Sequence, residues 1–423
     1  MKKVFISTIC ILLATFTSFT QDSTSHIKLT LQDAIILAQI QSVDAAVVLN
    51  ELKTAYWEYR THQADQLPEI NFTGTLPSYN NNYSRNTLSE NSSYIQNNWM
   101  EMRGKISVDQ NIPLTGGKIS LNTSLDFTRQ LGKGAYNEYM SIPIGITLEQ
   151  PIFGVNDQKW KRKIEPVRYN EAKASYIENV EEITILTINY FFNLLDAKAS
   201  LNIVTQNFEN ATKLYDIAVA RRKIGQISES ELMQLNLSAL QAKGIVTEEQ
   251  SKLNTRMFQL RSFLGLSEDD IIEPIVPGLA PSFRMDYHIV LEKALENNSF
   301  AQNILRRQLE ASYAVASAKG DRRKISLYAS FGYTGKDTTF GNAYDHLKGN
   351  QRIEVGVIIP LVDCGKRKGK VKVAESNREV VLSRTKQEQM NFNQNIFLLV
   401  ENFNNQDGQL EIAEQADIIA NKR

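Results

Sequence analysis

Six segments of the chain alternate apolar and polar residues with a period of two. In the clearest of them, Met102, Ile106 and Val108 fall on one side of an extended chain, and the residues next to them are mostly polar. Such alternation is typical of a β-strand with one apolar and one polar face. The six predicted strands are 70–76, 102–112, 119–127, 140–148, 325–333 and 353–359. By itself, the alternation is more often that of a soluble antiparallel sheet with one face in water.

The connections between these segments differ strongly in length. The stretch 78–98 is long, polar and rich in asparagine and tyrosine, whereas 114–118 has room only for a tight turn. Outer-membrane barrels have this asymmetry between long outer loops and short periplasmic turns. The strands also lie between very long predicted helices, and a self-contained β-sandwich domain does not need such helices. Both features favour strands that enter a membrane.

Two later stretches repeat apolar or small residues at alternating spacings of four and three. This heptad spacing is typical of a coiled-coil seam rather than of an ordinary amphipathic helix. The spacing predicts an antiparallel helical hairpin over 157–264, and its first helix, 157–224, would be about 100 Å long. The first seam is Tyr190, Leu194, Ala197, Leu201, Val204, Phe208, Ala211, Tyr215 and Ala218. The second is Leu232, Leu235, Ala239, Ala242, Val246, Leu253, Leu260 and Phe263, interrupted by the charged Glu249 and Arg256.

The turn of this hairpin is encoded by IGQISESEL, residues 224–232. Basic residues 221–223 favour the negative end of the first helix, and Gly225 can adopt the left-handed conformation that closes it. Ser228 and Glu231 have the spacing of a capping box, which opens the second helix. The turn is therefore explained by structural needs alone, and only its position at the end of so long a hairpin suggests more.

The chain repeats one pattern, in which an alternating strand leads into proline, a turn and a basic helix start. The two copies are LEQPIFGVNDQKWKRK and VIIPLVDCGKRKGKVK, with Pro151 and Pro360 as the strand-to-helix exits. Aligning these prolines without gaps places Leu201 on Leu410, and a second alignment upstream places Tyr56 on Tyr313. We therefore predict an internal duplication.

The predicted first repeat is 21–280, with a helix, strands within 70–150, the hairpin 157–264 and a linker 265–280. The second repeat is 281–423, with a helix, strands within 325–360 and a long helix 366–423. By this alignment the counterpart of the second hairpin helix would fall beyond Arg423. The second repeat is thus expected to be truncated, either as a fragment or as a natural form.

Composition narrows the class of protein. Residues 1–20 have two lysines and a short apolar run, as in a secretory signal peptide, and Cys10 lacks the context of a lipid-anchored cysteine. Only Cys364 would remain, so no disulfide forms within the chain. Lysine plus arginine and aspartate plus glutamate both number 47, which gives no basic excess for nucleic acid. No motif for nucleotide, metal or nucleophilic catalysis occurs, so we predict no enzyme activity and no cofactor.

These features together resemble the TolC-like outer membrane efflux family. The resemblance rests on the signal peptide, the duplication, the QPIF and IPLVDCG exits and the IGQISESEL turn, and it covers nearly the whole mature chain. It implies an α+β membrane protein, a homotrimer whose strands form one β-barrel in the outer membrane and whose helices form a coiled-coil tunnel in the periplasm. It further implies a passive exit duct for efflux or type I secretion, energised by an inner-membrane transporter through a periplasmic adaptor, or membrane fusion protein.

The chain departs from the family pattern in two respects. The family implies four barrel strands from each protomer, whereas the alternation predicts six, because of an additional hairpin over 104–129. The expected truncation would also remove one of the long helices from which the closed tunnel of the family is built. Two alternatives to the export duct therefore stand: a periplasmic or surface coiled-coil scaffold without a pore, and a truncated, non-functional remnant.

The resemblance also implies which residues carry function. The end of the hairpin would dock the adaptor, and acidic residues just beyond it would narrow the tunnel. The implied docking residues are Ile224, Gly225, Gln226, Ile227 and Ser228, and the candidate gate acids are Glu229 and Glu231, although Glu231 also fits a purely capping role.

Basic residues at a helix start oppose the helix dipole and need another explanation. Phospholipid phosphates of the periplasmic leaflet would supply one, with a tryptophan at the interface, and a solvated charged turn is the alternative. The residues concerned are Lys159, Trp160, Lys161, Arg162 and Lys163 in the first repeat and Lys366, Arg367 and Lys368 in the second.

Overall fold

The computed structural model describes residues 26–86, 93–132, 134–278, 283–323, 325–357 and 362–422. The predicted signal peptide therefore lies outside the described residues. The chain divides into two compact units. The helical unit comprises Met1–Asn50 and Tyr176–Pro281, and the sheet unit comprises Glu51–Ser175 and Ser282–Arg423.

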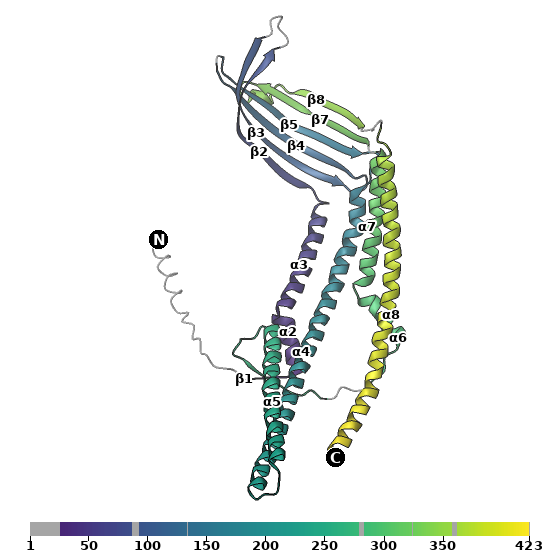
Figure 1. The fold of residues 1–423 in the computed structure, drawn as a ribbon. Helices are drawn as coiled ribbons and strands as arrows, with labels where there is room; N and C mark the ends of the chain where they lie inside the picture. The colour runs from purple at the N-terminus through teal and green to yellow at the C-terminus, as the bar shows by residue number, and fades with distance from the viewer. Residues whose placement is uncertain are drawn as a thin grey trace, which may run out of the picture. The chain divides into compact units, whose positions relative to one another are not determined.

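The sheet unit contains six antiparallel strands in one sheet (Figure 1). Their order is β2-β3-β4-β5-β7-β8, so β2 and β8 are the two edges. The strands are β2 (Glu69–Asn86), β3 (Ser93–Ile112), β4 (Gly117–Gln130), β5 (Tyr136–Pro151), β7 (Ile325–Asp337) and β8 (Lys348–Val357). The six strands predicted from alternation are confirmed. The tight turn predicted at 114–118 lies between β3 and β4.

The prediction of a long polar loop over 78–98 is wrong for most of its length. Strands β2 and β3 pair continuously from Ser78 opposite Glu101 to Asn86 opposite Ser93, and only 87–92 lie outside the described residues. The ladder is made by backbone N–H and C=O groups, which asparagine and tyrosine side chains leave free to pair. The polar composition of 78–98 therefore led to the prediction of a loop where the structure has a long β-hairpin.

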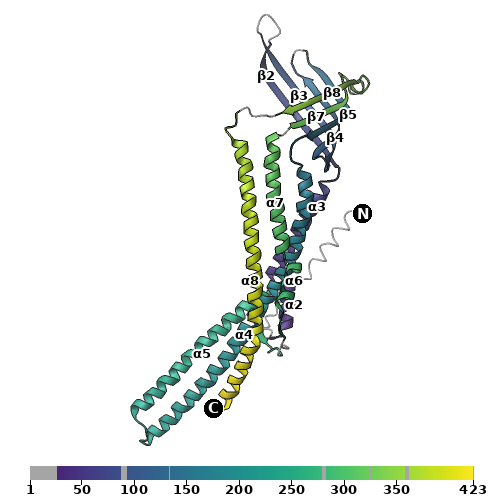
Figure 2. The ribbon, with the colours of Figure 1, turned by 90° about the vertical axis from the view of Figure 1, so that its right-hand side faces the viewer.

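In the sheet unit, α7 (Phe300–Gly320) packs against α8 (Lys366–Lys422) and also contacts the first part of α4 (Asp157–Lys223). Figure 2 shows α7 beside α8, and the rings of Phe300 and Phe392 stack with centroids 4.5 Å apart. This unit also contains the part of α3 (Val43–Ala64) from Glu51 onward, the shorter α6 (Tyr287–Asn297) and the 3-10 turns Asp321–Arg323 and Asn342–Tyr344.

A charged network joins α4 to α7. Arg306 donates to both Glu171 and Glu310, with Nη2 3.1 Å from Glu171 Oε1 and Nη1 2.9 Å from Glu310 Oε2. Asn303 donates to Glu171 as well, at 2.8 Å. Burial opposes ionisation of Glu171, but these hydrogen bonds outweigh it and lower the pKa of the Glu171 carboxyl. The network fixes the start of the long helix beside the second repeat.

The helical unit is built on the predicted hairpin. Helices α4 and α5 (Glu229–Leu264) pair along the heptad seams, and the rings of Tyr190 and Phe263 lie 5.0 Å apart. Their buried core includes Phe191, Leu194 and Leu260, none of which is exposed to solvent. Helix α2 (Leu31–Gln41) covers this core, and the parallel strands β1 (His26–Leu29) and β6 (Ile271–Pro274) flank it.

The order of helix, strands and long helix occurs twice along the chain. The first copy runs α3 (Val43–Ala64), β2 to β5 and α4, and the second runs α7, β7, β8 and α8. Four strands in the first copy and two in the second give the total of six. The exact bounds of the two repeats remain a prediction.

In the described part of the chain, no single helix is long and apolar enough to cross a membrane. The helices α2 and α3 are bent by 46° at their junction, and only the two taken together have the length and apolar composition of a membrane-spanning segment.

We predict that replacing Arg306 with leucine lowers the free energy of unfolding of the sheet unit by about 1–2 kcal/mol at pH 7, because Glu171 and Glu310 lose their common partner. The lowered pKa of Glu171 contributes stability that is fully present above its ordinary value of 4.5 and is lost as pH falls through the folded-state pKa. The difference between the two proteins should therefore shrink below pH 4.5.

Thermal melts followed by circular dichroism between pH 3.5 and 7 would measure this difference. Arg378→Leu is the matched control, because Arg378 forms an exposed ion pair with its sequence neighbour Glu379, 2.8 Å away, and such pairs contribute little. An equal loss in both variants at every pH would contradict the assigned role of Arg306.

Candidate functional site

One face of the sheet is lined by apolar side chains that stay exposed. Ile70 and Phe72 on β2 are both 74% exposed, and Ile353 on β8 is 68% exposed. The strand register aligns these residues with apolar residues of the strands between them. We call this surface the apolar belt, and its members are Ile70, Phe72, Ile106, Leu121, Ile146, Phe331, Ile353 and Val355.

The apolar belt has members on all six strands, although some direct partners are polar, such as Gln351 of β8 opposite Phe331 of β7. Leu121 on β4 lies opposite Ile146 on β5, which in turn lies opposite Phe331 on β7. Soluble monomers rarely expose a continuous apolar patch of more than a few hundred Å². The belt therefore needs contact with lipid or with another protein.

The opposite face of the sheet is polar and carries its own hydrogen-bond network. Asp109 accepts from Asn71 Nδ2 at 3.3 Å and from the Ser120 hydroxyl, and Lys118 Nζ lies 3.6 Å from it. Each of these residues alternates with members of the belt or its apolar neighbours, for example Asn71 between Ile70 and Phe72. The sheet thus separates an apolar face from a polar one over its whole width.

A second polar group lies nearer the other end of the same strands. Arg103 donates to Asp126 from Nε and to Glu101 from Nη2, both at 2.8 Å. The side chain of Asp126 is only 10% exposed. Charges that are paired in this way fit a water-filled interior better than a lipid-facing surface.

The predicted exit at Pro151 lies at the end of its strand. Pro151 is the last residue of β5, and the ladder with β7 continues for one more residue, because Ile152 N donates to Ile325 O at 2.8 Å. Pro151 pairs with Ser326 of β7, and its missing N–H falls on the β4 side, where pairing has already ended at Glu149. The proline therefore sits at the end of one ladder and not of both. Pro360 lies outside the described residues.

Asn156 anchors the start of α4, a role that the sequence analysis missed. Its Nδ2 donates to the carbonyls of Pro113 and Leu114 in the β3–β4 turn, both at 3.0 Å. Its Oδ1 accepts from the backbone N–H of Lys159 at 2.9 Å, as a helix N-cap does. The sequence did contain a signal for this role, because asparagine just before a predicted helix start is a common N-cap.

Asp363 has the corresponding role before α8. Its carboxylate accepts from the backbone N–H groups of Gly365 at 2.9 Å and Arg367 at 3.2 Å. These two bonds lower the pKa of Asp363, and they satisfy N–H groups at the helix start. At both basic helix starts, a polar or acidic cap thus offsets the unfavourable positive charge near the helix N-terminus. The sequence analysis did not include these caps.

The basic and aromatic residues at the start of α4 do not form one cluster. Lys159, Lys161, Arg162 and Lys163 are exposed, whereas Trp160 packs 5.8 Å from the ring of Tyr313 on α7. Lys163 Nζ lies 5.5 Å from the centre of the Trp160 ring. The tryptophan is therefore held by neighbours in the sheet unit, and its contact with a membrane stays a prediction.

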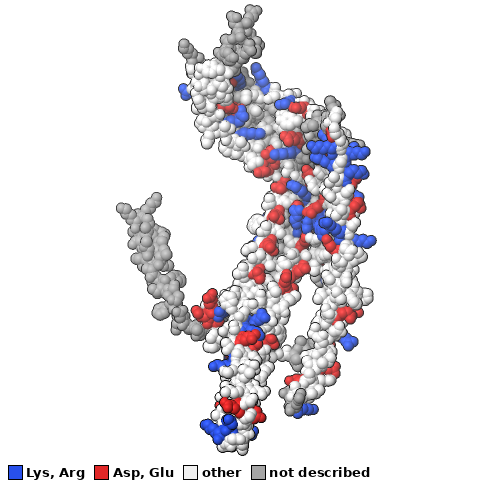
Figure 3. Space-filling view, in the orientation of Figure 1, with Lys and Arg blue, Asp and Glu red and all other residues white. Residues whose placement is uncertain are grey.

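At the start of α8, Lys366 and Lys368 are exposed and Arg367 is half-buried. Arg367 Nη1 donates to the carbonyl of Arg322 at 3.2 Å, which ties α8 to the end of α7. Figure 3 shows basic side chains gathered around the start of α8. The predicted basic start thus belongs to a wider basic surface.

The hairpin turn has the local geometry that its sequence predicts. Gly225 has φ 77°, Gln226 N donates to Arg221 O at 3.0 Å, and Gly225 N donates to Arg222 O at 3.0 Å, as in a Schellman motif. The capping box of Ser228 and Glu231 is present, with both hydrogen bonds formed.

The candidate docking and gate residues differ in their surroundings. Ile224 is 68% exposed, whereas Ile227 is half-buried and its carbonyl accepts from Arg222 at 3.4 Å. Glu229 lies 3.8 Å from Arg222, and hydrogen bonds from the Ser228 N–H and hydroxyl lower the pKa of Glu231. Glu231 is thus engaged as a cap, and Ile224 is the freest apolar group of the turn.

No group of three or more histidine, cysteine, aspartate or glutamate side chains within the described ranges could hold a metal ion. Cys364 is exposed and has a φ of 48°.

No family model and no curated protein sequence matches the chain. Solved structures do. The outer membrane protein VceC from Vibrio cholerae matches at a TM-score of 0.64 and 14% identity, over 93% of this chain and 83% of that one. CusC, which forms a transmembrane channel, matches at 0.62 and 14%, over 96% and 82%. The Campylobacter jejuni outer membrane channel CmeC matches at 0.62 and 14%, over 94% and 79%.

The chain has the fold of the TolC-like outer membrane channels. The resemblance inferred from the sequence is therefore confirmed at the level of the fold. The sheet of six strands in one chain exceeds the four that the resemblance implied, so the alternation was the better guide to strand number.

We predict that Ile146→Lys, in the middle of the apolar belt, strongly reduces the amount of folded protein in the outer membrane. A lysine on the lipid face of a barrel strand costs about 2–4 kcal/mol near the bilayer centre. Thr147→Lys is the matched control, because it adds the same charge one residue later, on the polar face, and should be tolerated. Quantitative immunoblots of membrane fractions would measure both variants, and equal loss in the two would contradict the assignment of the faces.

Proposed function

We propose that this chain is one subunit of an outer membrane export duct, in which the sheets of several copies close into one barrel. The observation that carries the proposal is the apolar belt, which crosses all six strands and is backed by a polar face with paired charges. In a barrel, the belt faces lipid and the polar face lines the water-filled interior. The fold shared with outer membrane channels supports the same conclusion.

A barrel requires more than one copy of the chain. The outer edges of β2 and β8 have no partner among the described strands, and unpaired backbone groups are not tolerated in hydrocarbon. Six strands are an even number, so β8 of one copy runs antiparallel to β2 of the next. Closure is then possible for any number of copies that the curvature allows, and the family resemblance favours three.

Three copies of a six-stranded sheet would give a barrel of about eighteen strands, a size at which barrels enclose an aqueous channel. Four strands from each copy would give a narrower lumen, because barrel diameter grows with strand number. The additional hairpin therefore supports a wide exit.

The duct is passive, and its energy comes from partners. By the family resemblance, an inner-membrane transporter drives export and a periplasmic adaptor docks at the hairpin turn. Ile224 supports the docking proposal, because a 68% exposed isoleucine at a turn has no core of its own to enter. The helices then form the periplasmic part of the conduit.

The first test is a cross-link between copies. In a Cys364→Ser background, Thr73→Cys on β2 is combined in turn with a cysteine at each position 350–354 of β8, and oxidation should give covalent dimers and trimers for at least one combination. Ser124→Cys on the central strand β4 replaces Thr73→Cys in the control and should give none. Monomers at every position would contradict closure through these edges.

The second test concerns the turn. Ile224→Asp should abolish export and cross-linking to the adaptor, because it places a charge where an apolar group would enter the adaptor. Ser230→Asp adds the same charge near the start of α5, where it suits the helix dipole, and should preserve both. The trimer should remain intact in each variant on native gels. Full export by the Ile224→Asp variant would show that the turn has only a structural role.

A further inference from the structure

The helices of the sheet unit lie in a row whose two outer sides are exposed. The rings of Tyr59 on α3 and Tyr169 on α4 stack with centroids 5.0 Å apart. Helix α4 contacts α7 through Trp160 and Tyr313, and α7 contacts α8. Figure 1 shows the same order, α3, α4, α7 and α8. The outer side of α3 and that of the first part of α8 therefore face away from their own chain.

The outer side of α3 has a heptad pattern that the sequence analysis did not use. Its largest member is Trp57, which is 64% exposed. Tyr59, which faces α4, lies two residues later and thus about 200° further around the helix. We call this the α3 stripe, and its members, spaced four and three throughout and all exposed, are Val43, Val47, Asn50, Thr54, Trp57, Thr61 and Ala64.

The outer side of α8 has the same spacing, with small residues in place of large ones. Val373 and Val380 are 61% and 46% exposed, and a glycine or serine lies between them and on either side. The buried Val371 belongs to the other side of the helix. We call the outer set the α8 stripe, and its members are Gly369, Val373, Ser376, Val380, Ser383 and Gln387.

Gly369 has no structural reason within its own chain. Its φ lies outside the left-handed region, and a Cβ at this position would meet no atom within 4 Å. Glycine also weakens a helix relative to alanine. A group that approaches closely from outside the chain would explain it. Together with Ser376 and Ser383, it places a small residue in every heptad, which leaves room for a large side chain such as an indole.

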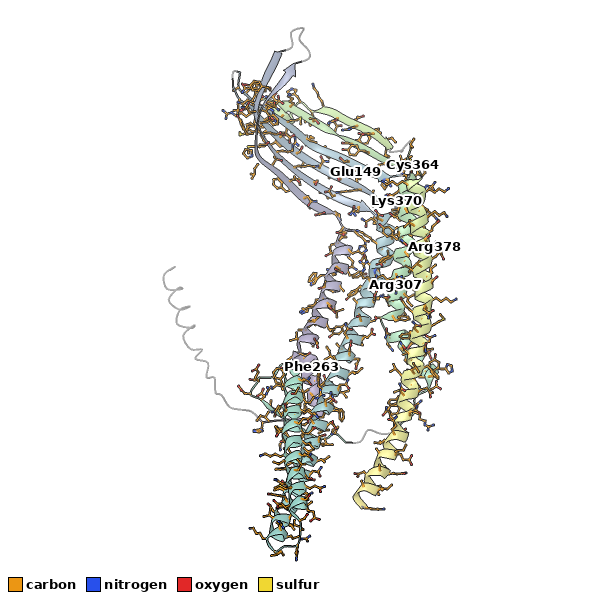
Figure 4. The ribbon with its side chains drawn as sticks, in the orientation of Figure 1. Glu149, Phe263, Arg307, Cys364, Lys370 and Arg378 are labelled. Carbon is orange, nitrogen blue, oxygen red and sulfur yellow. The ribbon has the colours of Figure 1, made fainter. Side chains whose placement is uncertain are left out.

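Charges beside the two stripes match in one orientation. Helix α3 runs toward the sheet and α8 runs away from it, so α3 of one copy and α8 of another would pack antiparallel. The residues that follow the d and a positions on the same flank then face each other. On this flank α3 has Glu51 and Glu58, whereas α8 has Lys370 and Arg384. Figure 4 shows Lys370 on the first turns of α8.

The other flank does not oppose this pairing strongly. It is basic on α3, with Lys53 and Arg60, and mixed on α8. Of the residues on α8, Lys372 is already paired with Glu375, 3.1 Å away, and Glu379 offers a carboxylate to the basic flank of α3. The acidic flank of α3 therefore sets the orientation.

We propose that α3 of one copy packs along the first part of α8 of the next copy as an antiparallel coiled-coil seam, with the indole of Trp57 between small residues of the α8 stripe. The partner is thus a second copy of this chain. The proposal rests on the proposed function, because α3 leads into the edge strand β2 and α8 follows the edge strand β8. Joining β8 to β2 of the next copy brings these two helices together.

The first test is a disulfide between the two stripes in the full-length oligomer. In a Cys364→Ser background, Thr61→Cys is combined in turn with Gly369→Cys, Ser376→Cys and Ser383→Cys. Oxidation should give covalent dimers and trimers for at least one combination, because a positions face d positions in an antiparallel pair. Gln63→Cys replaces Thr61→Cys in the control and should give none, since it lies on another side of α3.

The cross-links between β2 and β8 are measured in the same Cys364→Ser background. Monomers in all three Thr61→Cys combinations, while the β2–β8 cross-links still form, would overturn the seam and leave the barrel in place. Loss of the β2–β8 cross-links would contradict the proposed function and the seam with it. The two failures are therefore distinguishable.

The second test removes the indole. Trp57→Ala should raise the protein concentration at which half of the detergent-solubilised oligomer dissociates at least about tenfold, because a tryptophan at the centre of an interface often dominates its binding energy. Leu114→Ala is the control, since it removes an 87% exposed apolar side chain from the β3–β4 turn and should change nothing. Sedimentation measures both, and the same concentration for Trp57→Ala and the wild type would overturn the assigned role of Trp57.

Discussion

A β-sheet in hydrocarbon must satisfy every backbone N–H and C=O group, and the sheet of this chain has two open edges. Other features of the sheet unit depend on this constraint. An apolar face across six strands needs contact with lipid or with another protein, and contact with lipid is possible only if the edges are closed. The chain alone cannot meet both conditions, whereas several copies joined edge to edge can.

The junctions between strands and helices are the second place where backbone groups need hydrogen-bond partners. Where a strand ends, its backbone groups lose their ladder, and where a helix begins, its first N–H groups have no intrahelical acceptor. Asn156 solves both problems at one junction by bonding the β3–β4 turn and the start of α4 together. At α8, Asp363 accepts from the first backbone N–H groups of the helix, and Arg367 bonds the carbonyl of Arg322 after α7. Asn156 thus holds α4 to the sheet, and Arg367 holds α8 to the end of α7.

Much of this architecture could be predicted from the sequence because two periods are visible in it. The period of two gave all six strands, and the heptad seams gave the hairpin of α4 and α5 with its capping box. The hairpin over 78–98 was missed because pairing depends on backbone groups and not on apolar side chains. Contacts between distant segments, such as Arg306 with Glu171 or Arg322 with Arg367, have no local signal at all. Such pairs arise only when the fold brings the two segments together.

The central claim is that closed assemblies of this chain form a water-filled pore. Single-channel recording of the purified oligomer in planar lipid bilayers tests this claim most directly. The account predicts discrete conductance steps that are absent with Ile146→Lys, which disrupts the lipid face, and present with Thr147→Lys. A correctly assembled, membrane-inserted oligomer that gives no conductance steps under any applied voltage would contradict the account and favour a scaffold without a pore.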